Sequence, residues 1–339
     1  MPVTIREVAS VAGVSTATVS RALRGLPNVD DATRARVLEA AASLDYVVSP
    51  SASRLASGRT GTIAVVTPYI DRWFFATVLS GVEAVTRGAG LDLILLGVGD
   101  PARPDRLPTE QRLRARADGA IIVALPADAP EVQQVLAAHF PVSIVGSIVP
   151  DAPCVAIDDV DTARLATQHL INLGHRTIGL ISGTPHESPY AAQHQRHRGY
   201  AETMVTAGLE ADDRLMSYGD FTREGGERAM VEILSRPVVP TAVFCMSDEM
   251  AFGAIVALRL HGLRLGADIS LVGVDGHPQA EVVDLTTVEQ PVAEMGRIAA
   301  ESLLASLRAP GAATSAEAAG LIPTRLVVRG STASPRERR

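Results

Sequence analysis

Two spacings of apolar residues divide the chain into two parts. Near the amino end, apolar side chains recur every three or four positions, which predicts three short amphipathic helices at about 5–12, 16–23 and 31–45. From residue 62 onward, short apolar runs alternate with longer helical patterns, as in parallel sheets that are buried on both faces. We therefore predict a small all-α head followed by a large α/β body.

The body contains more strand patterns than one small sheet holds comfortably. Apolar runs predict strands at 63–66, 91–96, 120–124, 142–145, 178–181, 242–245 and 269–274, and helices lie between them near 75–87, 131–139, 162–173, 198–207, 223–234, 249–261 and 293–307. This alternation predicts doubly wound parallel sheets, and the number of strands favours two subdomains with a cleft between them. The last helix and a strand at 326–328 are expected to cross back between the halves.

The head contains residues that typically begin and end helices. Thr4 and Glu7 have the spacing of a capping box, and Gly13 permits the positive φ that ends a first helix. Ser15 is a good N-cap for the second helix, and Asp30 for the third. Two short helices joined by a tight turn that contains glycine form a helix-turn-helix, the motif that places its second helix in the major groove of DNA.

The second helix of this motif presents polar side chains on its outer face. Thr16, Ala17, Ser20 and Arg21 are predicted to face out, while the apolar residues of the helix face in. Arg21 is suited to a bidentate contact with guanine, and Thr16 can bond a base or touch a thymine methyl group. The alternative interpretation is a plain helical bundle with exposed polar residues.

These residues also resemble a known family. The head resembles the LacI/GalR family of bacterial transcription repressors at Val3-Thr4-Ile5-Arg6-Glu7-Val8-Ala9, Ala12-Gly13-Val14-Ser15, Thr18-Val19-Ser20-Arg21-Ala22-Leu23, Thr33-Arg34-Ala35-Arg36-Val37, Leu44-Asp45-Tyr46 and Gly58-Arg59-Thr60. The body resembles the family along nearly its whole length, to about Thr332. The resemblance implies an all-α helix-turn-helix head and a body like periplasmic binding proteins, with two doubly wound parallel-sheet subdomains.

The resemblance implies further contacts with DNA through a hinge. In this family a hinge folds into a short helix on operator binding, and a leucine from each protomer wedges into the minor groove, which kinks the duplex. Here the hinge would span 49–57, with Leu55 as the wedge; a plain linker is the alternative. The DNA-binding residues are then expected to be Thr4, Ser15, Thr16, Ala17, Ser20, Arg21, Asn28, Arg54 and Leu55.

Polar and aromatic side chains follow several of the predicted strands. Ligands of open α/β sheets bind outside the carboxyl ends of the strands. The positions that match the family's effector pocket are Trp73, Phe74, Arg196, Phe221, Ser247, Asp248 and Asp275. By resemblance, Asp275 and Arg196 would bond ligand hydroxyls and the two phenylalanines would stack on an apolar face, which suits a sugar. Asp248 as a helix N-cap, Phe74 as a core residue and Asp275 as a turn brace remain alternatives.

Composition narrows the choice of function. The net charge is −7, yet residues 1–60 hold seven Arg against five acidic residues, whereas the remainder holds 24 Arg against 33 acidic residues. The head therefore relies on placed arginines rather than on a strong basic field. The two Cys, Cys154 and Cys245, have no partner at metal spacing. We expect no metal, no cofactor, no catalytic residues and no membrane segment.

Together these features predict a ligand-responsive, sequence-specific transcriptional regulator, specifically a cytoplasmic repressor. Its expected partners are palindromic double-stranded operator DNA, a small-molecule effector of the sugar class and a second copy of the chain. The expected divisions are a head at 1–46, a hinge at 47–60, a body at 61–332 and a disordered tail at 333–339. Within the body, one subdomain takes about 61–160 and 290–322, and the other about 161–289 and 323–332. The alternatives are a sugar-binding module, a transcriptional activator and an enzyme on the same fold.

Overall fold

The computed structural model describes residues 3–23, 25–46, 59–98, 109–126, 128–149, 152–184, 191–309 and 320–336. Contacts divide the chain into two compact units, Met1–Gly61 and Thr62–Arg339. The predicted hinge residues Arg54 and Leu55 lie outside the described residues.

The first unit is a three-helix head. Helix α1 spans Ile5–Ala12, α2 Thr16–Leu23 and α3 Asp31–Ser43, and their core includes Val8, Val19 and Val37, which are fully buried. The caps predicted from the sequence are confirmed: Gly13 has a φ of 66°, and the Asp30 carboxylate accepts the Thr33 N–H at 2.8 Å. Helix α3 ends two residues before the predicted position, because Asp45 adopts a φ of 49° that no α-helix can continue.

The body contains two six-stranded sheets, which confirms the predicted doubly wound α/β class. The first sheet has the order β11-β5-β4-β3-β1-β2, and every pairing in it is parallel. Its strands are β1 (Thr62–Thr67), β2 (Asp92–Gly97), β3 (Gly119–Val123), β4 (Val142–Val145), β5 (Cys154–Ile157) and β11 (Leu321–Ile322).

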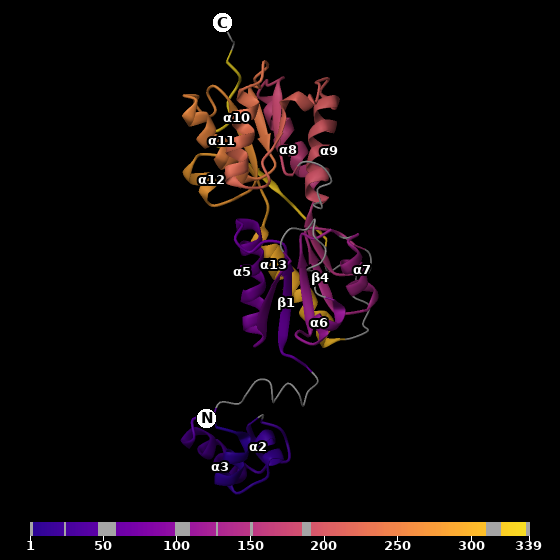
Figure 1. Cartoon of the computed structure of the whole chain (residues 1–339), viewed down its shortest axis with the longest axis vertical. Helices are drawn as coiled ribbons and strands as arrows, with labels where there is room; N and C mark the ends of the chain where they lie inside the picture. Colours follow the sequence, from indigo (N-terminus) through magenta and orange to yellow (C-terminus); the bar gives the residue numbers. More distant parts are fainter. Residues whose placement is uncertain are drawn as a thin grey trace. The chain divides into compact units, whose positions relative to one another are not determined.

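Helices cover both faces of this first sheet. Alternate residues of β1 point to opposite sides: Ile63 and Val65 pack with α5 (Trp73–Gly88) and α13 (Val292–Arg308). Ala64 and Val66 pack instead with α6 (Glu110–Arg114) and α7 (Pro130–Ala137). Figure 1 shows α13 beside α5, although five of the six strands of the second sheet lie between these helices in the sequence.

The second sheet has the order β12-β10-β9-β8-β6-β7, in which only the pairing of β10 with β12 is antiparallel among the described strands. Its strands are β6 (Ile178–Ser182), β7 (Met216–Tyr218), β8 (Ala242–Cys245), β9 (Ser270–Asp275), β10 (Thr286–Glu289) and β12 (Arg325–Val327). Its helices are α8 (Asp159–Asn172), α9 (Ala191–Thr206), α10 (Arg223–Leu234), α11 (Asp248–Leu260) and α12 (Gln279–Val282), and a 3₁₀ turn spans Asp213–Leu215. One large apolar core joins the two layers of helices to this sheet.

Within the described ranges, the chain crosses between the two sheets at three places. It leaves the first sheet after β5, returns after β10 to form α13 and β11, and crosses again into β12. The crossing segments are Asp158, Gln290–Pro291 and Pro323–Thr324 by the bounds of the flanking elements. A hydrogen bond of 3.2 Å between the Thr162 and Thr324 hydroxyls ties the first crossing to the third. The two sheets are therefore linked by several short connections that lie close together.

The chain continues in an ordered path beyond the predicted end of the body. The backbone N–H of Ala333 donates to the Ser270 hydroxyl at 3.0 Å, and its carbonyl lies 2.9 Å from Nε2 of the buried His175. The prediction of a disordered tail from residue 333 is thus wrong for Ala333, because buried polar groups of the second sheet need the partners that this segment supplies. Residues 337–339 lie outside the described residues.

Helices α10 and α11 approach closely through two glycines. A Cβ built on Gly253 would collide with the backbone carbonyl oxygen of Arg223, and one on Gly226 would collide with that of Met250. These contacts involve backbone atoms, which cannot rotate away as a side chain can. The helix pair therefore depends on the absence of side chains at these two positions.

The Gly253→Ala variant is expected to be less stable than the parent protein by about 2–3 kcal/mol, because overpacking forces the two helices apart. Urea denaturation followed by circular dichroism measures the difference. The Gly88→Ala variant is the control: Gly88 also lies in a helix, but a Cβ there meets no atom within 4 Å. Equal stability of the two variants would contradict the proposed close contact.

Candidate functional sites

The head presents one face of α2 to solvent. The Ser15 hydroxyl accepts the Thr18 N–H at 3.1 Å and so caps the helix. Thr16, Ala17 and Arg21 are exposed, and Ser20 is half-buried. The outward-facing surface predicted from the sequence is therefore present, with an arginine among small residues.

The other predicted DNA-binding residues of the head surround this helix in sequence. Thr4 is exposed at the start of α1, where its N–H and hydroxyl both donate to the Glu7 carboxylate, at 2.7 and 2.9 Å. Asn28 is exposed in the turn before α3 and has a φ of 71°, in the left-handed region that asparagine tolerates better than most residues. Arg34 fixes the turn after α2, since its guanidinium donates to the carbonyls of Ala22 and Leu26 at 3.2 and 3.0 Å.

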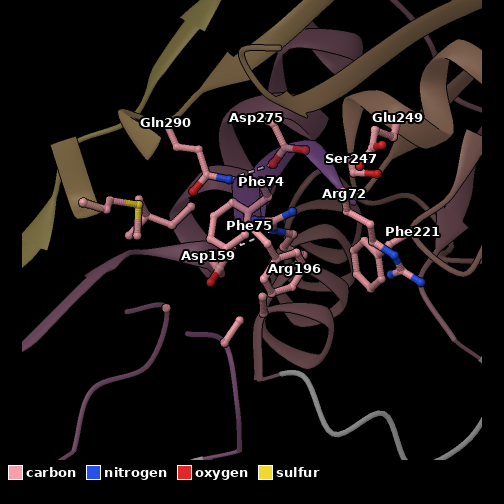
Figure 2. A pocket seen from close by; sticks show the side chains of 15 residues that line it. Arg72, Phe74, Phe75, Asp159, Arg196, Phe221, Ser247, Glu249, Asp275 and Gln290 are labelled. Atoms are coloured by element: carbon pink, nitrogen blue, oxygen red, sulfur yellow. Dashed lines mark hydrogen bonds and ion pairs between the residues drawn. The ribbon is translucent and has the colours of Figure 1, made fainter. Parts of the chain in front are cut away.

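The body holds a pocket at the carboxyl ends of strands from both sheets (Figure 2). Its empty space is about 730 Å³, open solvent included. The polar and aromatic side chains that line it are Arg72, Phe74, Phe75, Asp159, Arg196, Phe221, Ser247, Glu249, Asp275 and Gln290. Each of these residues lies at the end of a body strand or in the loop or helix that follows one. This is where ligands of open α/β sheets bind.

Arg196 is the buried cation of the pocket. Its Nε donates to Asp159 Oδ1 at 2.7 Å, and its Nη1 donates to the backbone carbonyl of Met246. Burial opposes the charged guanidinium, but the carboxylates of Asp159, Asp275 and Asp248 outweigh burial and raise the pKa of Arg196. Arg196 therefore stays charged and fixed in direction, with its remaining N–H groups available to a ligand.

Asp275 ends β9 at the base of the pocket. Its Oδ1 accepts from Gln290 Nε2 at 2.7 Å, and only 6% of the residue is exposed. Burial raises the pKa of Asp275, against the opposing effect of Arg196. The φ of Asp275 is 132°, which costs energy for a residue with a Cβ. Such a conformation persists only where the surroundings impose it, and it directs the carboxylate toward the pocket side (Figure 2).

Aromatic rings form the apolar part of the pocket. Phe74 and Phe75 at the start of α5 meet edge to face, with ring centroids 5.3 Å apart. Phe221 lies beyond β7 and has a φ of 52°, in the left-handed region, as does Ala124 of the pocket lining with a φ of 48°. Flat apolar surfaces beside buried charged groups suit a molecule with hydroxyls on its edges and C–H groups on its faces.

The structure brings together five of the seven predicted effector residues. Phe74, Arg196, Phe221, Ser247 and Asp275 line the pocket. Ser247 is also the N-cap of α11, since its hydroxyl accepts the Met250 N–H at 3.3 Å.

The two other predicted residues do not line this pocket. Asp248 is fully buried behind it in the first turn of α11, and its Oδ2 accepts the backbone N–H of His277 at 2.8 Å. Its alternative role as N-cap is wrong, because Ser247 occupies that position. Burial, followed by the Asp275 carboxylate, raises the pKa of Asp248. The Trp73 ring packs on His277, with centroids 4.8 Å apart, and so bridges the two halves of the body instead.

Four polar pocket residues were missing from the predicted effector residues: Arg72, Asp159, Glu249 and Gln290. Gln290 lies in the second crossing, directly after β10, and Asp159 follows the first crossing as the first residue of α8. The signal available for Asp159 was its place just after the apolar run 154–157, the same signal that marked Asp275. These two residues place the pocket next to the connections between the sheets.

Within the described residues, no group of three or more His, Cys, Asp or Glu side chains is arranged to hold a metal ion. The same residues include no helix that is long and apolar enough to cross a membrane.

Glu249 makes the stability of the folded protein depend on pH. Burial, then the nearby Asp275 carboxylate, raises its pKa to about 7 from an ordinary value of 4.5, against the effect of Arg72. The folded protein thus binds a proton that the unfolded chain releases above pH 4.5. The resulting stabilisation is full below pH 4.5 and is lost as the pH rises through about 7.

The Glu249→Gln variant should therefore match the parent protein at pH 4 and be more stable at pH 8, by about 1 kcal/mol after allowance for partial exposure. Urea denaturation at several pH values measures this difference. The exposed Glu281→Gln is the control. A stability difference that does not change with pH would contradict the shift.

Comparison with known proteins places these features in a family. Residues 4–49 match the family described as bacterial regulatory proteins, lacI family, and residues 167–332 match the periplasmic binding protein-like domain. The chain is 34% identical over 336 residues to the HTH-type transcriptional repressor CytR of Escherichia coli (strain K12), with 97% of this chain and 96% of that protein covered. It is 34% identical over 307 residues to the transcriptional regulator GalR of the same strain, with 89% and 88% covered.

Solved structures of other regulators are also similar to this chain over nearly its whole length. The transcriptional regulator CelR in complex with cellobiose is 33% identical, with a TM-score of 0.70 and coverage of 97% of this chain and 99% of that one. The Lac repressor dimer bound to operator and the anti-inducer ONPF is 26% identical, with a TM-score of 0.85 and coverage of 98% and 100%. A helix-turn-helix head joined to a two-sheet ligand-binding body defines a DNA-binding transcriptional regulator. The chain belongs to the lacI family of bacterial regulatory proteins.

Proposed function

We propose that this regulator is a repressor that binds a palindromic operator as a homodimer and is controlled by a small sugar in the body pocket. The observation that carries the proposal is the presence in one chain of an exposed arginine-bearing helix and of a pocket that takes residues from both sheets. The protein acts by binding rather than by catalysis. It works in the cytoplasm, where operator DNA lies.

The head supplies the DNA contacts. Helix α2 enters the major groove, Arg21 reads guanine, and Thr16 and Ala17 contact neighbouring base edges. A single helix-turn-helix reads few base pairs, so specific binding needs two heads at a fixed separation. The body supplies the contact between protomers, and Leu55 of each hinge enters the minor groove between the half-sites.

The pocket supplies the ligand contacts. Arg196 and Asp275 hold the hydroxyls of the sugar, and Gln290 and Asp159 hold these two side chains in place. Phe74 and Phe221 cover the apolar face of the ring. The complex of CelR with cellobiose supports a sugar, since that protein is similar to this one over nearly the whole chain.

Effector binding is coupled to DNA binding through the segments that cross between the two sheets. Asp159 and Gln290 stand where the chain passes between sheets, so a ligand that bonds them and Asp275 prefers one angle between the two halves. That angle sets the separation of the two hinges and hence of the two heads. A tenfold preference of the ligand for one conformer shifts the equilibrium by about 1.4 kcal/mol.

Two measurements on the full-length protein test the proposal. Selection of bound sequences followed by footprinting should reveal a protected inverted repeat. A thermal-shift screen with mono- and disaccharides, purines and sugar phosphates, repeated with the selected DNA, should find a sugar that stabilises the protein and changes its occupancy of that repeat. Absence of a protected repeat under every condition would contradict DNA binding, and stabilisation only by non-sugars would contradict the sugar class.

A further inference from the structure

A second pocket of the body opens beside the effector pocket. Its empty space is about 910 Å³, open solvent included. It shares three residues with the effector pocket, namely Arg72, Phe221 and Glu249. In Figure 2 these three side chains occupy one side of the effector pocket, opposite Gln290 and Asp159. The two pockets are therefore consecutive chambers that meet at this trio.

The outer chamber differs from the inner one in chemistry. The inner chamber holds the buried Arg196 and Asp275 between phenylalanine rings. The outer chamber is bordered by Asp71 and Gln279, which are exposed, by the exposed ion pair of Arg223 with Glu224, and by the rings of Tyr69 and Phe252. Exposed oxygen and amide groups beside aromatic rings offer hydrogen bonds along an edge and an apolar contact on a face.

The residues at the junction are held in place by their own contacts. The Arg72 guanidinium lies 3.5 Å from the centroid of the Tyr69 ring, a cation–π contact that fixes its direction. Phe221 adopts a φ of 52°, and its ring borders both chambers. A sugar ring bound in the inner chamber would thus have one open side, at the three shared residues. A substituent of that sugar could pass through this side into the outer chamber.

His277 completes the wall of the outer chamber in a fixed tautomer. Its Nδ1 accepts the backbone N–H of Gln279 at 3.0 Å, so in the neutral ring Nε2 carries the proton. Trp73 and Phe252 pack against this ring, with centroids 4.8 and 5.1 Å away. Burial lowers the pKa of His277, which keeps the ring neutral near pH 7. The neutral imidazole thus joins the charged and polar groups that border the chamber.

We propose that the outer chamber is a second sugar subsite and that the effector of this protein is a disaccharide, with its linkage at Arg72, Glu249 and Phe221. This rests on the proposed function, in which the first ring occupies the inner chamber. Carboxylate, amide and imidazole groups around an open aromatic floor match the many hydroxyls of a second sugar ring. A flat base would bond few of these polar groups and would leave the others to water.

Isothermal titration of the full-length protein tests the proposal. The probes are maltose, cellobiose, lactose and trehalose, each compared with glucose and galactose, and with adenosine and cytidine as nucleosides. We expect one disaccharide to bind at least about tenfold more tightly than either of its monosaccharides, as added hydrogen bonds of a second ring predict. The Asp71→Ala/Gln279→Ala double variant should weaken that disaccharide about tenfold and leave monosaccharide binding unchanged.

The exposed Glu281→Ala on the same short helix as Gln279 is the matched control, and it should change neither affinity. A monosaccharide that binds as tightly as every disaccharide, or a double variant that weakens both classes equally, would overturn the second subsite alone. Tightest binding of a nucleoside would overturn the disaccharide class. Failure of every sugar to bind would overturn the proposed function as well.

Discussion

The Arg21→Ala variant is expected to lose specific operator binding and to keep its effector affinity. Arg21 is the exposed arginine of α2, and a bidentate contact with guanine is worth about 1–3 kcal/mol in each head. Because a dimer carries two heads, operator affinity should fall by about 100-fold or more. Fluorescence anisotropy with operator and scrambled duplexes, at one fixed salt concentration, measures the loss.

The Arg36→Ala variant is the matched control for charge. It removes the same charge from the head, but Arg36 lies on α3 and donates only to the neighbouring Thr33 hydroxyl at 3.3 Å among the described residues. We expect it to weaken operator and scrambled DNA alike and slightly. If Arg21→Ala retained its preference for the operator, α2 would not be the reading helix.

The second large effect is expected at Asp275. The Asp275→Asn variant should bind the effector about 100-fold more weakly, because hydrogen bonds to a charged group contribute about 1.5–3 kcal/mol each and the amide cannot accept at both of its atoms. Operator affinity should be unchanged, so effector concentrations that change the operator occupancy of the parent protein should leave that of the variant unchanged. Titration calorimetry measures effector binding, and operator occupancy with and without effector measures the response.

The thermal midpoint of the Asp275→Asn variant distinguishes a loss of effector contacts from a folding defect. Asp275 is buried beside Asp248, and its pKa is raised, so removal of its charge should not lower the thermal midpoint at pH 7. The exposed Asp213→Asn is the control for a neutral substitution elsewhere on the body. A variant with full effector affinity would remove Asp275 from the site, and joint loss of effector and operator binding would point to misfolding.

Much of the head was predictable from local chemistry. Caps at Ser15 and Asp30 and a left-handed glycine at Gly13 act within a few residues of each position, so their spacing alone specifies where the helices begin and end. Burial of Val8, Val19 and Val37 follows from the same helical period. The sequence therefore contained nearly all the information for this part.

The pocket was predictable only in part. Asp275 and Ser247 follow long apolar strands, so their place at a strand end was visible in the sequence. Gln290 was missed because β10 reads Thr-Thr-Val-Glu, a polar pattern, although Thr286 and Thr287 are fully buried in the sheet. The Thr286 hydroxyl bonds to the distant Arg329 carbonyl and Thr332 hydroxyl, and the Thr287 hydroxyl accepts the Gly276 N–H, partners that no local pattern reveals.

The positions of Trp73 and Asp248 outside the pocket lining have a related cause. Both stand next to true pocket residues in the sequence, but neighbouring residues at a helix start point in different directions. Trp73 contacts His277 of the other half, a partner about 200 positions away along the chain. Its direction was therefore decided by tertiary packing rather than by the resemblance of the segment.

The three crossings have a consequence for the order of assembly during synthesis. The head is complete once its residues emerge from the ribosome, and it can fold while the body is still being made. The first sheet, by contrast, lacks α13 and β11 until the chain has been translated through the second sheet as far as Ile322. A nascent chain thus carries a folded DNA-binding head before its effector-binding body is complete. Premature termination of translation would release DNA-binding heads that no effector controls.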